Sequence, residues 1–121
     1  LIKQVAALWK RWRPRWIVLE DAASGPGMLS HFRQEAPLVP IVPVPAKESK
    51  LIRARAASPS VERGDVLLPA CAPWVEDFLA ELTNFPYGKH DDQVDAFAYL
   101  VLRFINKRFL VELEKIKRPD W

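Results

Sequence analysis

Cysteine is scarce in this sequence: Cys71 is the only one among 121 residues. A single cysteine excludes an intramolecular disulfide and a cysteine-based zinc site. No apolar run reaches the roughly 18 residues that a transmembrane helix needs, so we expect no association with a membrane. No signal peptide is visible either, because Lys3, Gln4, Lys10 and Arg11 interrupt the first apolar stretch.

Three motifs that mark common classes of enzyme are also absent. The chain contains no phosphate-binding Gly-x-x-x-x-Gly-Lys-Ser/Thr loop and no dinucleotide-binding Gly-x-Gly-x-x-Gly segment. It contains no Gly-x-Ser-x-Gly elbow of the serine hydrolases. The charged residues therefore become the main candidates for chemistry.

The composition fits one modest domain with a packed core. Half of the residues are hydrophobic and 27% are charged, with a net charge of +3. The basic residues include two segments: Lys3, Lys10, Arg11, Arg13 and Arg15, and then Lys47, Lys50, Arg53 and Arg55. Such segments suit a polyanion such as DNA, although solvated surface charge explains either segment alone equally well.

The acidic residues Asp91, Asp92 and Asp95 fall within five positions, at the start of an expected amphipathic helix. Their repulsion makes this placement costly unless a cation or a helix N-terminus compensates it. Metal-dependent nucleases use such carboxylates to hold Mg²⁺ or Mn²⁺ against a phosphate. The alternative is N-capping, with Asp91 as the cap and Asp92 in the first turn. Helical periodicity also places Asp91 and Asp95 nearer the apolar face than Asp92.

Glu20 is a second candidate, because it follows the apolar run 16–19, which is typical of a buried parallel strand. The C-terminal ends of such strands are where α/β sheets place their sites, although a plain surface carboxylate is the commoner case for one residue alone. Together with the late aspartates, Glu20 predicts a site for two metal ions roughly 4 Å apart. His90, in the loop before the aspartates, is a candidate phosphate contact or a neighbour of the metal ions; an imidazole without a role is the equal alternative.

Alternating helical and strand patterns predict an α/β fold with a short, mostly parallel sheet flanked by helices. Helices are expected at 1–12, 28–35, 47–57, 73–83 and 91–108, and strand-like segments at 16–19, 39–44 and 66–69. The pair Ser58-Pro59 is expected to end the third helix, and the prolines within 39–44 indicate an edge strand. We expect the domain to span 1–108, followed by a charged tail at 109–121.

Four short sequence blocks follow one another in a characteristic order along the chain. They are EDAASG at 20–25, the basic spacing Lys50-x-x-Arg53-x-Arg55, GDVLLP at 64–69, and FPYGKHDDQVDA at 85–96. In order and spacing, from about Ile2 to Leu102, the sequence resembles the nuclease domain of tailed-phage terminase large subunits. The last block is the most specific of the four.

The resemblance implies an RNase H-like fold and a metal-dependent endonuclease that cuts concatemeric viral DNA. It assigns the catalytic carboxylates to Glu20, Asp91, Asp92 and Asp95. Of these, Glu20, Asp92 and Asp95 would bind two Mg²⁺ or Mn²⁺ ions, and Asp91 would mainly cap the helix. Residues expected to bind DNA are Lys47, Lys50, Arg53, Arg55, Lys89 and His90.

The resemblance also implies partners. These are double-stranded phage DNA and, in the intact protein, a terminase ATPase domain, the small terminase subunit and the portal. The protein would be encoded by a phage or prophage and would act in the cytoplasm of a bacterial host cell.

The sequence departs from the family pattern at its beginning. The first strand of an RNase H-like fold carries the first catalytic Asp, and no acidic residue precedes Glu20 here. We therefore expect a partial RNase H-like domain, truncated at its N-terminus, that lacks its first strands and one metal-binding carboxylate. Such a loss would reduce activity severely.

Two other interpretations stay open. One is an inactive prophage remnant that at most binds DNA through Lys47, Lys50, Arg53 and Arg55. The other is a different RNase H-like two-metal nuclease, such as a transposase or resolvase, although the block at 85–96 argues against it.

Overall fold

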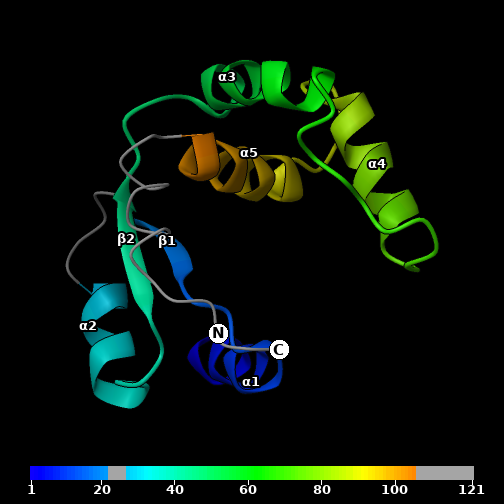
Figure 1. Ribbon diagram of the computed structural model, residues 1–121. Helices are drawn as coiled ribbons and strands as arrows, with labels where there is room; N and C mark the ends of the chain where they lie inside the picture. The colour runs from blue at the N-terminus through cyan, green and yellow to red at the C-terminus, as the bar shows by residue number, and fades with distance from the viewer. Residues whose placement is uncertain (22–26, 106–121) are drawn as a thin grey trace. The chain divides into compact units, whose positions relative to one another are not determined.

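The computed structural model describes residues 1–21 and 27–105, which form a mixed α/β structure (Figure 1). The elements are α1 (Ile2–Trp12), β1 (Ile17–Asp21), α2 (Gly27–Glu35), β2 (Ile41–Pro45), α3 (Lys50–Glu62), α4 (Val75–Asn84) and α5 (Asp92–Ile105). They divide into two compact units, residues 1–47 and 48–121. The α/β class is confirmed, whereas the expected tail at 109–121 lies outside the described residues.

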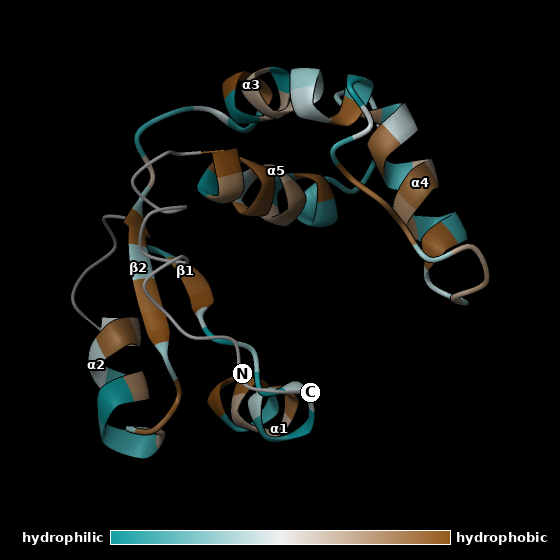
Figure 2. Cartoon of the chain, viewed as in Figure 1, coloured by the Kyte–Doolittle hydropathy of each residue, from teal (hydrophilic) through white to brown (hydrophobic). Residues whose placement is uncertain are grey.

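The first unit contains a short parallel sheet. Strands β1 and β2 pair so that Ile17 lies opposite Ile41 and Glu20 opposite Val44. Figure 2 shows hydrophobic residues along both strands. The sheet has two strands among the described residues, so both are edge strands, and β2 accommodates its prolines as the sequence predicts. Glu20 accordingly lies near the C-terminal end of a parallel strand.

The second unit is helical, with α5 packed against both α3 and α4. Figure 1 shows α3 and α5 running side by side. Their contact is built on the small side chains Ala57 and Ala98 together with Val101, all of which are buried. Against α4, the ring of Phe78 meets that of Phe97 edge-on at a centroid distance of 5.4 Å. The apolar stripe expected on the last helix is therefore the surface that joins the three helices.

Two expectations about the second unit are wrong. Pro59 does not end α3, which continues to Glu62. The buried residues Ala57 and Ser60 keep this helix in register on both sides of the proline, so tertiary packing outweighs one lost hydrogen bond. Residues 66–69 form no strand, because no described strand lies beside them; Val66 instead packs against the helical core.

No helix within the described residues combines the length and the apolar character needed to cross a lipid bilayer.

Candidate functional site

The start of α5 faces the start of α3, and opposite charges meet there in two layers. In the first layer, Nζ of Lys50 lies 2.8 Å from Oδ1 of Asp91 and 3.6 Å from Oδ1 of Asp92. In the second layer, one turn further along both helices, Arg53 donates two hydrogen bonds of 2.8 Å to the two carboxylate oxygens of Asp95. Two residues of the second basic segment, which the sequence assigned to DNA, therefore face the acidic cluster.

The three aspartates differ sharply in their access to solvent. The exposed fraction of the side chain is 95% for Asp92, 43% for Asp91 and 10% for Asp95. This order confirms that Asp95 lies toward the apolar face of the helix and Asp92 away from it. A cation arriving from solvent can reach Asp92 and Asp91 directly, whereas Asp95 is already enclosed.

The Arg53–Asp95 pair is enclosed by further contacts of the arginine. Arg53 is only 5% exposed, and its guanidinium carbon lies 4.4 Å from the ring centroid of Tyr99 on α5. It also donates a hydrogen bond to the carbonyl of Glu48, just before α3. Removing one partner of such a buried pair typically costs about 3–5 kcal/mol, because the other charge stays buried and uncompensated.

Lys50 lies in a more open setting, with its side chain 41% exposed. The hydrogen bond to Asp91 is the main cause that raises the pKa of Lys50 above its usual value; desolvation opposes this shift, and the charges of Asp91, Asp92 and Asp95 add to it. The ammonium therefore stays protonated beside the acidic cluster. Two neighbouring carboxylates thus already share one cation, supplied by the chain itself.

The N-terminus of α5 is capped by a residue that the sequence did not indicate. Oε1 of Glu81, on α4, accepts hydrogen bonds from the backbone N–H groups of Gln93 (2.6 Å) and Val94 (3.2 Å). Oε2 of Glu81 accepts from the side chain of Gln93 at 2.8 Å. These are the amides that a capping side chain at Asp91 would satisfy; Asp91 holds the N-cap position, because its carbonyl accepts from the N–H of Asp95, but its side chain does not cap the helix. Its carboxylate is turned to Lys50 instead.

The charge of Glu81 is favoured by this position. Desolvation is the largest single influence and raises the pKa of Glu81, but the hydrogen bonds from Gln93 and Val94, with the charge of His90, together lower it below its usual value. An ionised carboxylate at the positive end of the helix dipole is the arrangement that such a shift reflects.

The turn between α4 and α5 carries Lys89 and His90. The carbonyl of Asn84 accepts hydrogen bonds from the N–H groups of Tyr87 (2.8 Å) and Gly88 (2.9 Å). A side chain at Gly88 would bring its Cβ within 3.3 Å of Cβ of Asn84, so glycine leaves the turn room that a larger residue would reduce. Lys89 and His90 are exposed, and they share a shallow hollow with acidic neighbours, among them Glu81.

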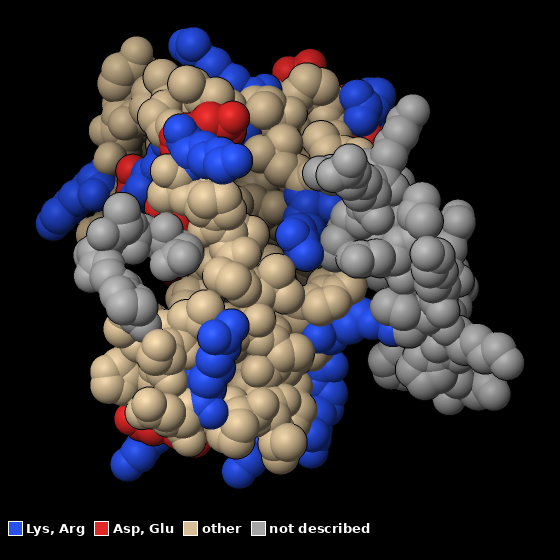
Figure 3. All heavy atoms as spheres, turned by 90° about the vertical axis from the view of Figure 1, so that its left-hand side faces the viewer, with Lys and Arg blue, Asp and Glu red and all other residues tan. Residues whose placement is uncertain are grey.

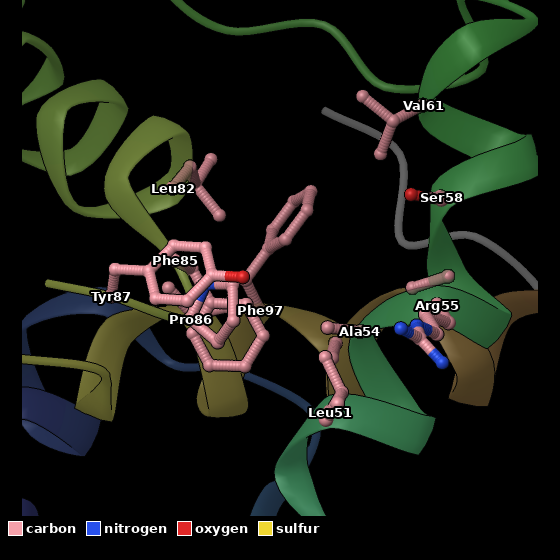
Figure 4. Close-up of a pocket in the computed structure, with 13 residues that line it drawn as sticks. Leu51, Ala54, Arg55, Ser58, Val61, Leu82, Phe85, Pro86, Tyr87 and Phe97 are labelled. Atoms are coloured by element: carbon pink, nitrogen blue, oxygen red, sulfur yellow. The ribbon is translucent and has the colours of Figure 1, made fainter.

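An apolar hollow of about 490 Å³ lies between α3, α5 and the segment 85–87 (Figure 4). Leu51 and Ala54 line one side of it, and Phe85 and Phe97 line the other. Arg55, another expected DNA contact, is exposed and belongs to the lining as well. Phe85 and Pro86, which begin the block at 85–96, therefore lie beside the helix that carries Asp92 and Asp95.

The expected metal site is assembled only in part within one unit. Glu20 is exposed and belongs to the first unit, whereas the aspartates belong to the second, so their convergence stays a prediction. Among residues 1–21 and 27–105, no group of three or more His, Cys, Asp or Glu side chains could hold a metal ion. The donors themselves suit Mg²⁺ or Mn²⁺, because Asp91 and Asp92 offer hard carboxylate oxygens directed at one cation.

The basic residues expected to bind DNA differ in their exposure. Figure 3 shows Lys and Arg side chains scattered over the described part of the face in view, with apolar and polar surface between them. Lys47 and Arg55 are exposed, while the charges of Lys50 and Arg53 are turned to aspartates. The expected DNA contacts therefore fall into exposed and internally paired residues.

The sequence did not predict the roles of two residues that are important to this region. Glu81 lies 12 positions before the amide that it caps, and no local pattern links the two. Tyr99 carries the Arg53 guanidinium on its ring, and its only signal was its place one turn beyond Asp95 on the same helix. Both depend on the packing of α5 against its neighbours.

The comparisons with known proteins gave one match. A family model described as the terminase RNaseH-like domain matches residues 2–104. Neither the curated proteins nor the solved structures gave a match. The mixed α/β structure with its short parallel sheet is consistent with a partial RNase H-like domain.

Proposed function

Because this chain belongs to the terminase RNase H-like domain family, we propose that it serves as the nuclease domain of a phage DNA-packaging terminase. In this role it cuts concatemeric double-stranded viral DNA with the help of Mg²⁺ or Mn²⁺. The observation that carries the proposal is the convergence of Asp91 and Asp92 on one cation at the start of α5. Carboxylates that already share a cation are suited to share a divalent one.

The carboxylates that build the metal site in this proposal are Glu20, at the end of β1, and the cluster Asp91, Asp92 and Asp95. When bound, divalent ions supply Lewis-acid stabilisation and a water of lowered pKa for attack on the phosphodiester. The protein contributes the position of the carboxylates, which α3 and the Glu81 cap hold at the start of α5. It also contributes positive charge: exposed Lys47 and Arg55, with Lys89 and His90, contact the DNA backbone.

The complete DNA-packaging motor would include further partners. A terminase ATPase domain drives DNA movement, and the small terminase subunit and the portal position the DNA and the motor. The setting is the cytoplasm of a bacterial host cell.

A plasmid-cleavage assay tests the proposal. The 121-residue chain is incubated with supercoiled plasmid and Mn²⁺, and nicked and linear products are measured on a gel. Because no acidic residue precedes Glu20 in this chain, we expect slow cleavage, which is lost on chelation and is reduced further by Asp92→Asn and by Glu20→Gln. The matched control is Asp65→Asn, because Asp65 pairs on the surface with Arg63 and should leave cleavage unchanged.

The same assay separates the proposal from a DNA-binding remnant. Binding of plasmid without cleavage, with both Mg²⁺ and Mn²⁺, would support the remnant and contradict the nuclease. The structure lends the remnant less support, because two of its four expected DNA contacts, Lys50 and Arg53, are engaged with aspartates.

A further inference from the structure

The buried Arg53–Asp95 pair separates Asp95 from the other two aspartates in role. Both carboxylate oxygens of Asp95 accept hydrogen bonds from the guanidinium, and both residues are buried. Asp91 and Asp92 instead share a partly exposed lysine, and Asp92 is almost fully exposed. Resting on the proposed function, we infer that Asp95 is a positioning residue that acts through Arg53, while Asp91 and Asp92 present their oxygens to the metal ion.

A metal ion at Asp95 would compete with the guanidinium for the two carboxylate oxygens, which already accept hydrogen bonds from Arg53 in an enclosed place. If the ion displaced the guanidinium, Arg53 would remain buried, over the ring of Tyr99, with its charge uncompensated. Lys50 is different, because its long, partly exposed side chain can move its ammonium into solvent when a divalent ion replaces it. Exchange of one cation for another is therefore easy at Asp91 and Asp92 and costly at Asp95.

The geometry also shows what the pair positions. Lys50 and Arg53 are three residues apart on α3, and Asp91 and Asp95 are four residues apart, so each pair sits on one face of its helix. The buried pair fixes which turn of α3 faces which turn of α5. If α5 moved by one turn along α3, Asp91 and Asp92 would be taken away from Lys50.

The experiment measures Mn²⁺ binding by calorimetry, together with the unfolding temperature, on the full 121-residue chain. Asp92→Asn should leave the unfolding temperature nearly unchanged and weaken Mn²⁺ binding about tenfold or more, as a lost ligand does. Asp95→Asn should lower the unfolding temperature by at least about 10 °C and weaken Mn²⁺ binding as well.

The decisive variant replaces both members of the buried pair, Arg53→Met with Asp95→Leu. If Asp95 acts through Arg53, this apolar pair restores both the unfolding temperature and Mn²⁺ binding toward those of the unaltered chain. If Asp95 is itself a ligand, the folded double variant still fails to bind Mn²⁺, and the inference is overturned.

A second variant decides the matter should the double variant not fold. Arg53→Lys keeps the carboxylate of Asp95 and a positive charge but loses the bidentate geometry. The positioning role predicts Mn²⁺ binding that is several-fold weaker; a ligand role predicts unchanged or tighter binding, because Asp95 is released more easily. Absence of Mn²⁺ binding by the unaltered chain would overturn the proposed metal-dependent function instead. The unfolding temperatures of the same variants would then decide whether Arg53 and Asp95 act as one unit.

Discussion

The two layers of charge between α3 and α5 each pair a basic residue of α3 with aspartate, but their surroundings are opposite. Lys50 with Asp91 lies partly in solvent, whereas Arg53 with Asp95 lies in the interior, one turn away. Water and salt screen the first pair, and its members can exchange partners. The second pair is isolated from both, so neither member can be changed alone without exposing the other to an apolar interior. Adjacent ion pairs on the same two helices can therefore serve different purposes.

The sharpest way to break this contrast is to remove one member of the buried pair. Asp95→Ala should lower the free energy of unfolding by about 3–5 kcal/mol, because Arg53 stays buried without its counter-charge. Urea denaturation followed by circular dichroism measures this change. Asp92→Ala, on the same helix and almost fully exposed, is the matched control and should change stability little. Equal losses for the two variants would contradict the contrast.

A milder change tests whether geometry matters beyond charge in the buried layer. Arg53→Lys keeps the positive charge but replaces a planar fork by a single ammonium, so it cannot satisfy both oxygens of Asp95 in the same way. We expect a loss of about 1–3 kcal/mol, between those of the truncation and of a surface substitution. Chemical denaturation measures it, and a neutral result would mean that the bidentate arrangement contributes nothing.

The third prediction concerns Glu81, a carboxylate held by amides rather than by a basic side chain. Its folded-state pKa lies below the usual value, so its contribution to stability is present above the ordinary glutamate pKa and is lost as the pH falls through the lowered value. Glu81→Gln should destabilise the second unit at neutral pH by less than either Arg53 or Asp95 variant. Its stability should also depend less on pH in the acidic range. Thermal unfolding across that range, compared with Glu76→Gln on the same helix, measures the difference.

The smallest effect is expected in the exposed layer. Lys50→Met should change stability by at most about 1 kcal/mol, because partly exposed ion pairs are screened by solvent. The difference from the unaltered chain should shrink further between about 0.1 M and about 1 M salt. A loss as large as that of Asp95→Ala, insensitive to salt, would show that the two layers are not distinct.

Much of the local structure was predictable from the sequence. The helical stripe of α5, the parallel strand before Glu20 and the edge character of β2 follow from periodicity and from proline chemistry. The failures were long-range. Pro59 stays within α3 because residues on both sides of it are buried, and residues 66–69 have no partner strand in the part of the chain that the structure describes. Neither circumstance is written in the local sequence.

The site was predictable to a similar degree. The acidic cluster was found, and helical periodicity placed Asp95 on the inner side. What local patterns do not reveal is the partner of each charge. Arg53 lies 42 residues before Asp95, and an arginine in a basic segment reads as a DNA contact until the fold shows that it faces inward. Glu81 was overlooked for the same reason, since its role exists only once α4 and α5 are packed together.

The Glu81 cap has a further consequence for the segment between α4 and α5. Hydrogen bonds from Gln93 and Val94 to Glu81 tie the two ends of this segment together, and Asn84 closes a smaller turn inside it. Hydrogen bonds between α4 and α5 thus hold the two ends of the loop 85–91 close together. Such a loop loses little conformational entropy when it meets a ligand. The amide hydrogens of Gln93 and Val94, which Glu81 accepts, should exchange with solvent at a rate set by the opening of α4 from α5.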